Sequence, residues 1–356
     1  MSSDSRILAY VASSGPQGMG TIRCYALNLA TGALEFMHQS EEVRNPSFLV
    51  VHPNKRLLYC ANEIGDYQGQ VAGALSAFAI DPQTWKLTLL NQQSTLGSGP
   101  CFVGLDNTAR YAMASNFGSG SVAIFPIRAD GSLAAASDMV QHPTLGEKYP
   151  HAHSIRMDPA NRIAVVCDLG LDRVLFYRVD LEHGKLTPNT QPYLQLAQGA
   201  GPRHSEFHPN GKWLYVINEM DNTLTAILCD AARGTFEEIE TISTLPAGYA
   251  ERSYCGDVHV SANGKFVYGT NRGHNSVVAL AVDQESGKLT PVGWEPCQGD
   301  WPRNLALDPT GRYLLSATHN SNNIVSFAID PKTGKLTPTG ANLSVSVPLC
   351  IKFVTL

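Results

Sequence analysis

The chain has 356 residues, of which 43% are hydrophobic and 16% charged, and this composition excludes a disordered or fibrous protein. Its 26 Lys and Arg residues stand against 31 Asp and Glu residues, which gives a net charge of −5. Because no basic run occurs along the chain, neither nucleic acid nor a membrane surface is expected as a partner.

The N-terminal segment predicts a cytoplasmic protein. Residues 1–6 lead into only a short apolar stretch without a cleavage-type site, and no stretch approaches the roughly 18 apolar residues of a membrane span. The eight cysteines are scattered and include no Cys-x-x-Cys pair. We therefore expect reduced thiols in the core of a cytoplasmic chain.

A short tag, usually Gly-x-Leu after an Asp or Thr, recurs seven times along the chain. In chain order the copies are Gly32-Ala33-Leu34, Trp85-Lys86-Leu87, Gly131-Ser132-Leu133, Gly184-Lys185-Leu186, Gly234-Thr235-Phe236, Gly287-Lys288-Leu289 and Gly334-Lys335-Leu336. Their third residues are 53, 46, 53, 50, 53 and 47 positions apart, a period of about 50 that is typical of propellers and solenoids. A division into two domains would interrupt this period, so we expect one domain over residues 1–356.

Most tags are preceded by a segment that predicts a strand, a turn and a second strand. In residues 202–219, a strand around 205–207 is followed by the turn 208–212 and the apolar strand 213–217. Counterparts begin near Pro46, Pro100, His151, Cys255 and Pro302. A third strand follows at 223–229, and the tag occupies the hairpin turn before a fourth. Four strands per period predict the blade of a β-propeller.

The two ends of the chain predict how the ring closes. Residues 347–353 have the form of a first strand, whereas residues 7–12 have the form of a second strand. The C-terminal segment would then supply the innermost strand of a blade whose outer three strands come from the N-terminus. The sequence thus predicts an all-β, seven-bladed β-propeller with four-stranded blades, closed by N- and C-terminal strands in one blade.

This topology places the start of each first strand and the end of each second strand on one face of the ring. The residues expected on that rim are Asn45, Glu63, Asn116, His151, His153, Asp168, Arg203, His204, Asn218, Glu219, Asp257, Arg272, His274, Trp301, Arg303, Asn304 and His319. The opposite face would gather the chain-reversing turns, such as Pro209-Asn210-Gly211, and no site is expected there.

The rim set suits a small anionic or oxygen-rich ligand, because Arg can bind carboxylate or phosphate with two parallel hydrogen bonds. For ester or lactone hydrolysis, the same set supplies a base for water and cations for the tetrahedral oxyanion. His151 and His153 alternate along one strand, yet no carboxylate third ligand accompanies them, so no metal is expected.

Four groups of residues resemble the seven-bladed propeller lactonase family, which includes bacterial 6-phosphogluconolactonases and fungal carboxy-cis,cis-muconate cyclases. They are Gly201-Pro202-Arg203-His204 with Phe207-His208-Pro209-Asn210, Asn218-Glu219, Asp257-Val258-His259 running to Asn271-Arg272, and Pro302-Arg303 with Asp308-Pro309-Thr310-Gly311-Arg312. The resemblance covers essentially the whole chain. It implies hydrolysis of a sugar lactone, such as 6-phospho-D-glucono-1,5-lactone, without a metal or organic cofactor.

The resemblance also implies a catalytic set of His153, Arg203, Glu219 and Arg272. Glu219 would accept a proton from water, Arg203 and Arg272 would stabilise the oxyanion, and His153 would protonate the leaving alkoxide. The expected substrate-binding residues are His151, Asp168, His204, Asn218, His274, Trp301 and Arg303.

Two other functions remain open from the sequence. One is muconate cyclisation, which the same residues could serve, and the other is a non-catalytic binding module, since a propeller fold does not fix function. Only Trp301 among the four tryptophans lies near the rim, which favours an enzyme over a protein-binding platform. The expected partner is a small-molecule lactone, and the chain is expected to be a monomer or a weak homo-oligomer.

Overall fold

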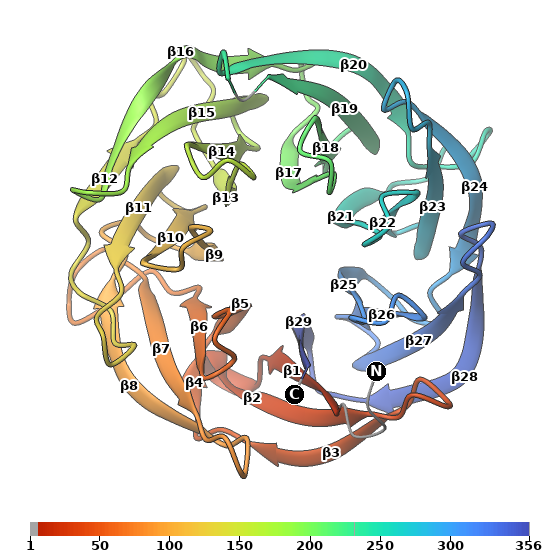
Figure 1. Cartoon of the computed structure of the whole chain (residues 1–356), viewed down its shortest axis with the longest axis horizontal. Coiled ribbons are helices and arrows are strands. Elements are labelled where there is room, and N and C mark those ends of the chain that lie inside the picture. The colour runs from red at the N-terminus through yellow and green to blue at the C-terminus, as the bar shows by residue number, and fades with distance from the viewer. Residues whose placement is uncertain (1–5, 231, 356) are drawn as a thin grey trace.

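The computed structural model describes residues 6–230 and 232–355, which form a ring of seven sheets around a central axis (Figure 1). This confirms the predicted all-β propeller with four-stranded blades. Residues 1–5, 231 and 356 lie outside the described part, so one domain over 1–356 stays a prediction. No helix among the described residues is long and apolar enough to cross a membrane.

Six blades are continuous in sequence, with strands that run outwards from the axis in chain order. The first three contain β5 (Pro46–Val51), β6 (Leu57–Asn62), β7 (Ala74–Ile80) and β8 (Leu87–Ser94); β9 (Pro100–Leu105), β10 (Tyr111–Asn116), β11 (Ser121–Pro126) and β12 (Asp138–Gln141); and β13 (Ala152–Met157), β14 (Ile163–Asp168), β15 (Arg173–Asp180) and β16 (Lys185–Gln195). The next three contain β17 (Pro202–Phe207), β18 (Trp213–Asn218), β19 (Thr223–Asp230) and β20 (Thr235–Ser243); β21 (Tyr254–Val260), β22 (Phe266–Arg272), β23 (Ser276–Val282) and β24 (Leu289–Pro296); and β25 (Pro302–Leu307), β26 (Tyr313–Thr318), β27 (Asn323–Ile329) and β28 (Leu336–Ser344).

The seventh blade is composite, as the sequence predicted. Its strands, from the axis outwards, are β29 (Pro348–Thr355), β1 (Ile7–Ser13), β2 (Met19–Leu27) and β3 (Leu34–Gln39), and β4 (Val43–Arg44) pairs with Met19 and Gly20 at the start of β2. A short 3-10 turn, η1 (Pro16–Gly18), connects β1 to β2. Leu8 pairs with Val354 and Val11 with Ile351, so antiparallel hydrogen bonding between the two ends of the chain closes the ring.

The tag recurs because each copy forms the same turn and contacts the neighbouring blade. The first residue of every tag has a positive φ, from 63° at Gly184 and Trp85 to 86° at Gly131, a region that favours glycine. A buried tyrosine of the preceding blade's second strand donates its hydroxyl proton to the tag carbonyl in four cases. These bonds run from Tyr10 to Trp85 (2.8 Å), Tyr59 to Gly131 (3.0 Å), Tyr215 to Gly287 (2.9 Å) and Tyr268 to Gly334 (3.1 Å). The repeat therefore encodes contacts between blades as well as strands within them.

The core lies between the blades. Phe176 and Phe236 of adjacent blades stack with ring centroids 3.8 Å apart. All eight cysteines are buried and free, which confirms the expectation of reduced core thiols. We call the face where the innermost strands begin the upper face, and the face where they end the lower face.

Replacement of Tyr215 by Phe should lower the free energy of unfolding by about 1–3 kcal/mol, because the buried carbonyl of Gly287 would lose its hydrogen-bond partner. Tyr193→Phe is a matched control, since the Tyr193 ring is exposed. The unfolding free energies of both variants are measured by urea denaturation, with tryptophan fluorescence as the signal. Equal stability of the two variants would contradict a stabilising role for the bond between blades.

Candidate active site

Arg203, Glu219 and Arg272 form a buried ion-pair cluster on the upper face. Arg203 is the second residue of β17, Glu219 follows the last residue of β18, and Arg272 ends β22. The Glu219 Oε2 atom lies 2.9 Å from Arg203 Nε and 2.8 Å from Arg272 Nη2. Arg203 is 2% exposed, whereas the Glu219 side chain keeps 20% of its surface exposed. One carboxylate thus joins two neighbouring blades.

Backbone contacts fix these groups in place. Glu219 donates its backbone N–H to the carbonyl of Gly201 at 2.7 Å. Arg203 Nη1 donates to the Gly256 carbonyl at 2.6 Å, and Arg272 donates from Nε and Nη2 to the Cys255 carbonyl at 3.1 and 2.5 Å. Three atoms of this cluster form no hydrogen bond with other described residues: Arg203 Nη2, Arg272 Nη1 and Glu219 Oε1. These three atoms can bind a ligand.

Burial lowers the pKa of both guanidinium groups, and for Arg272 the value falls to about 10. The positive charge of the neighbouring arginines lowers the two values further, and the Glu219 carboxylate opposes the shift. Both groups therefore stay cationic at neutral pH.

Arg303 and Glu63 extend the cluster across the upper face. Arg303, the second residue of β25, has its Nη2 atom 3.6 Å from Oε2 of Glu63, and both side chains are partly exposed. Trp301 precedes β25 with a φ of 65°, and the Arg272 guanidinium lies 5.3 Å from its ring centroid. Three arginines and two glutamates face one another here, which leaves one positive charge in excess. An excess positive charge favours an anionic ligand.

His153 lies in β13 on the same face and is buried, with 5% of its surface exposed. Its ring packs edge-on against Phe117 at 5.5 Å and against His204 at 5.1 Å. Burial, together with the charges of Arg203 and Arg303, holds the pKa of His153 well below 6.5. The imidazole is therefore neutral at pH 7.

His204 and Asp257 form a second buried pair beneath the arginines. Burial lowers the pKa of His204 to about 3, although Asp257 favours its protonated form. Burial also opposes ionisation of Asp257, but His259 and His204 outweigh it and hold its pKa well below 3.8. The neutral His204 thus donates its Nδ1–H to Asp257 Oδ1 at 2.6 Å. Its Nε2 atom, 3.3 Å from Arg203 Nη1, is left to accept a bond from that guanidinium.

His151 lies near His153 but has its own contacts. Its ring stacks on Phe117 at 4.6 Å, and Nδ1 lies 2.9 Å from the Phe117 carbonyl. Asp168 is fully buried: one oxygen lies 2.5 Å from Nδ1 of His142 and the other accepts the backbone N–H of His151. Asp168 therefore holds the backbone of His151 in place and is too deeply buried to contact a ligand.

Asn218 is likewise an internal residue. It is buried and donates to the hydroxyls of Thr223 and Thr225 at 2.8 and 3.0 Å. His274 is half-buried at the edge of the face, with Nδ1 2.7 Å from the hydroxyl of Ser276. Of the expected residues, the structure therefore brings together His153, Arg203, His204, Glu219, Arg272, Trp301 and Arg303.

Sequence reasoning missed Cys101, whose Sγ atom lies 3.6 Å from Nδ1 of His153. Burial raises the pKa of this thiol, so it is a neutral neighbour of the histidine and not a nucleophile. The repeat could have indicated this position. Pro100-Cys101 begins β9 in the same way that Pro202-Arg203 begins β17 and Pro302-Arg303 begins β25.

No group of three or more His, Cys, Asp or Glu side chains in residues 6–230 and 232–355 has the arrangement of a metal site. The groups that the upper face presents are carboxylate, guanidinium and neutral imidazole side chains.

Two of the four buried histidines in the described part of the chain, His153 and His204, predict a stability that falls as the pH drops below about 6.5. The unfolded chain takes up protons there, whereas His153 and His204 in the folded chain do not, so each contributes up to about 1.4 kcal/mol per pH unit. His153→Gln should make the change in unfolding free energy between pH 7 and pH 5 smaller, and the change that remains comes from His204 and from the lesser shifts of His38 and His274. The exposed His183→Gln variant is the control, and a pH dependence of stability that is unchanged in His153→Gln would show that this histidine is not held neutral.

Comparison with known proteins agrees with this architecture. The family model for the seven-bladed β-propeller lactonases matches residues 8–353. The chain is 34% identical to the 6-phosphogluconolactonase of Bacillus subtilis, over 98% of this chain and 99% of that protein. It is 30% identical to the 6-phosphogluconolactonase of Formosa agariphila, over 85% of this chain and 86% of that protein. The solved periplasmic gluconolactonase of Pseudomonas aeruginosa superposes with a TM-score of 0.91 at 30% identity, over 99% of both chains. The chain therefore belongs to the seven-bladed β-propeller lactonase family.

Proposed function

We propose that the protein hydrolyses a sugar lactone to the aldonic acid, with 6-phospho-D-glucono-1,5-lactone or a related aldonolactone as its substrate. Two relatives that carry the name 6-phosphogluconolactonase support this substrate class. The observation that carries the proposal is the cluster of Arg203, Glu219 and Arg272, in which one carboxylate oxygen and two guanidinium nitrogens are left for a ligand. Such a set suits a phosphate and a developing oxyanion.

Glu219 is the proposed general base. Both guanidiniums hold its Oε2 atom, so Oε1 accepts the proton of a water molecule as the water oxygen attacks the lactone carbonyl carbon. N–H groups of Arg203 and Arg272 stabilise the negative charge that forms on the carbonyl oxygen. When the ring C–O bond breaks, Glu219 returns its proton to the ring oxygen, which leaves as a hydroxyl group.

We propose a role for His153 that differs from the one that the sequence suggested. An imidazolium that could protonate the leaving alkoxide is not available at neutral pH, because burial and nearby arginines keep His153 neutral. We propose that its N–H donates a hydrogen bond to the substrate instead. Asp257 and His204 act as positioning residues for Arg203, and Arg303 with Trp301 contacts the remainder of the substrate.

Two further features stay proposals: a cytoplasmic location within sugar-phosphate metabolism (the pentose phosphate pathway), and a monomeric or weakly self-associating state. The relative from P. aeruginosa is named a periplasmic enzyme, so membership of the family does not by itself fix the compartment.

The proposed reaction is tested with a pH-indicator assay on phosphorylated and unphosphorylated aldonolactones and on muconolactones. Hydrolysis of an aldonolactone well above the spontaneous rate is expected. Glu219→Gln should lower kcat on the order of 10²–10⁴-fold, because the amide cannot accept the proton from water.

Glu63→Gln is the matched control, since Glu63 also pairs with an arginine on this face but has no proposed role in proton transfer. It should retain kcat within a few-fold. Wild-type turnover by Glu219→Gln would refute the assignment of the base, and hydrolysis of none of the panel would refute lactonase activity.

A further inference from the structure

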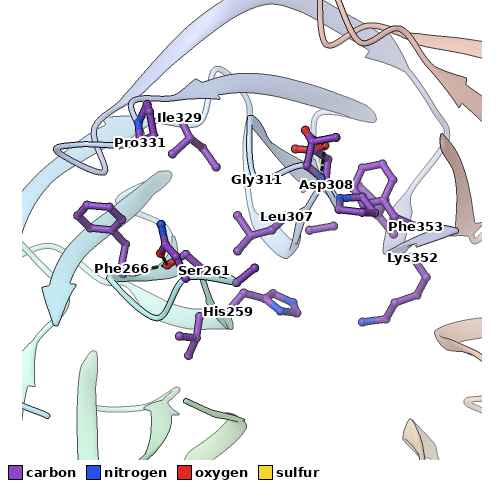
Figure 2. A pocket seen from close by; sticks show the side chains of 17 residues that line it. His259, Ser261, Phe266, Leu307, Asp308, Gly311, Ile329, Pro331, Lys352 and Phe353 are labelled. Carbon is purple, nitrogen blue, oxygen red and sulfur yellow. Dashed lines mark hydrogen bonds between the residues drawn. The ribbon is translucent and has the colours of Figure 1, made fainter. Parts of the chain in front are cut away.

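A large cavity lies on the lower face, at the opposite end of the axis from the arginine cluster. It has a volume of about 510 Å³ and is bounded by the ends of β21, β25 and β29 (Figure 2). A second cavity of about 420 Å³ lies against β5, β9, β13 and β17, and Lys352 borders both. We call the first the lower cavity. Its volume is within the range of small-molecule sites, roughly 300–1,000 Å³.

Lys352 supplies a cation to the lower cavity. In Figure 2, its side chain and that of His259 extend from their strands into the same space. Its Nζ atom lies 4.6 Å from the ring centroid of Phe48, and no carboxylate among the described residues lies within ion-pair distance of it. A partly buried ammonium without a counterion favours an anion beside it.

The groups around Lys352 leave that charge uncompensated. Across the axis, Arg156 Nη2 pairs with Glu206 Oε2 at 2.9 Å, and His259 Nδ1 lies 3.5 Å from the same oxygen. Asp257 is buried and accepts hydrogen bonds from His204 and Asn304. Asp308 lines the lower cavity, but it is also buried and accepts the backbone N–H groups of Arg312 and Tyr313. All three carboxylates are therefore engaged by other residues.

The walls of the lower cavity are mainly apolar. Leu307, Ile351 and Phe353 line it, together with Phe266 and Ile329 further out. A sugar acid, which carries a hydroxyl on almost every carbon, would leave those hydroxyls without partners against such walls. An apolar or planar body would instead bury the walls from water.

The lower cavity is separated from the upper face by three packed rings. Phe48 and Phe102 stack at 4.2 Å, and His204 meets them edge-on at 5.6 and 5.4 Å. All three side chains are buried. A ligand in the lower cavity would therefore not occupy the space beside Glu219.

We propose that the lower cavity binds a small organic carboxylate with an apolar, planar body, whose carboxylate contacts Lys352 and whose body lies against Leu307 and Phe353. This site is distinct from the proposed lactonase site in position and in ligand class. It does not depend on the lactonase assignment.

Benzoate is the probe, with inorganic phosphate as the comparison, and binding is measured by calorimetry and saturation-transfer NMR on the full chain. A nine-atom ligand should bind with a dissociation constant on the order of millimolar. Lys352→Met keeps most of the side-chain length but removes the charge, and should weaken benzoate binding at least tenfold. Lys332→Met, in an exposed turn, is the matched control.

Arg272→Gln, in the upper cluster, should leave benzoate affinity unchanged. The proposal is overturned if benzoate fails to bind, if Lys352→Met binds it as the wild type does, if Arg272→Gln abolishes binding, or if phosphate binds as tightly as benzoate. Thermal denaturation of each variant checks that it is folded, and Lys352→Arg, which restores the charge, should restore binding. Each outcome is independent of whether lactones are hydrolysed.

Discussion

Contacts between neighbouring blades hold the ring together, and the hydrogen bond from a second-strand tyrosine to the next blade's tag is their most regular form. The tag's first residue, with its positive φ, turns a carbonyl towards the blade before it, as Gly287 does towards Tyr215. Because each blade is fixed by the next, side chains far apart in sequence keep a constant relation across the axis. The carboxylate of Glu219 can therefore meet guanidiniums from two blades with similar distances of 2.9 and 2.8 Å.

The innermost strands share a second device. In all seven, the regular pairing with the second strand shifts near the start of the innermost strand, as between Pro202 and His204 or between Pro302 and Asn304. Such bulges re-aim a side chain and are common beside active sites. The residues skipped by the pairing include His153, Arg203 and Arg303. One irregularity, repeated around the ring, thus supplies one layer of functional side chains.

The sequence predicted the blades, their number and the composite closure, because a period of about 50 residues with four strands leaves few alternatives. It also predicted the rim on which Arg203, Glu219 and Arg272 meet. It could not show that Asp168 and Asn218 bond inwards, because the contact of Asp168 with His142 depends on packing between two blades and that of Asn218 with Thr225 on packing within one. The neutral state of His153 was likewise hidden, since it follows from burial and from charges on other blades. The turn-rich lower face gave no sign of a cavity, which arises where three strands end.

The pairing of β1 with β29 has a consequence for biosynthesis. β1 leaves the ribosome before the other strands of the ring and β29 leaves after them, with more than 330 residues between Ser13 and Pro348. At typical translation rates, the interval between them is on the order of tens of seconds. During that time the inner edge of β1 has no partner, and an unpaired strand edge can recruit another chain. Arg303 and Glu63 lie on the two blades that flank the composite blade. Their 3.6 Å contact therefore also forms only when β29 completes the composite blade. Completion of the ring and completion of the upper face are thus a single late event in the life of each molecule.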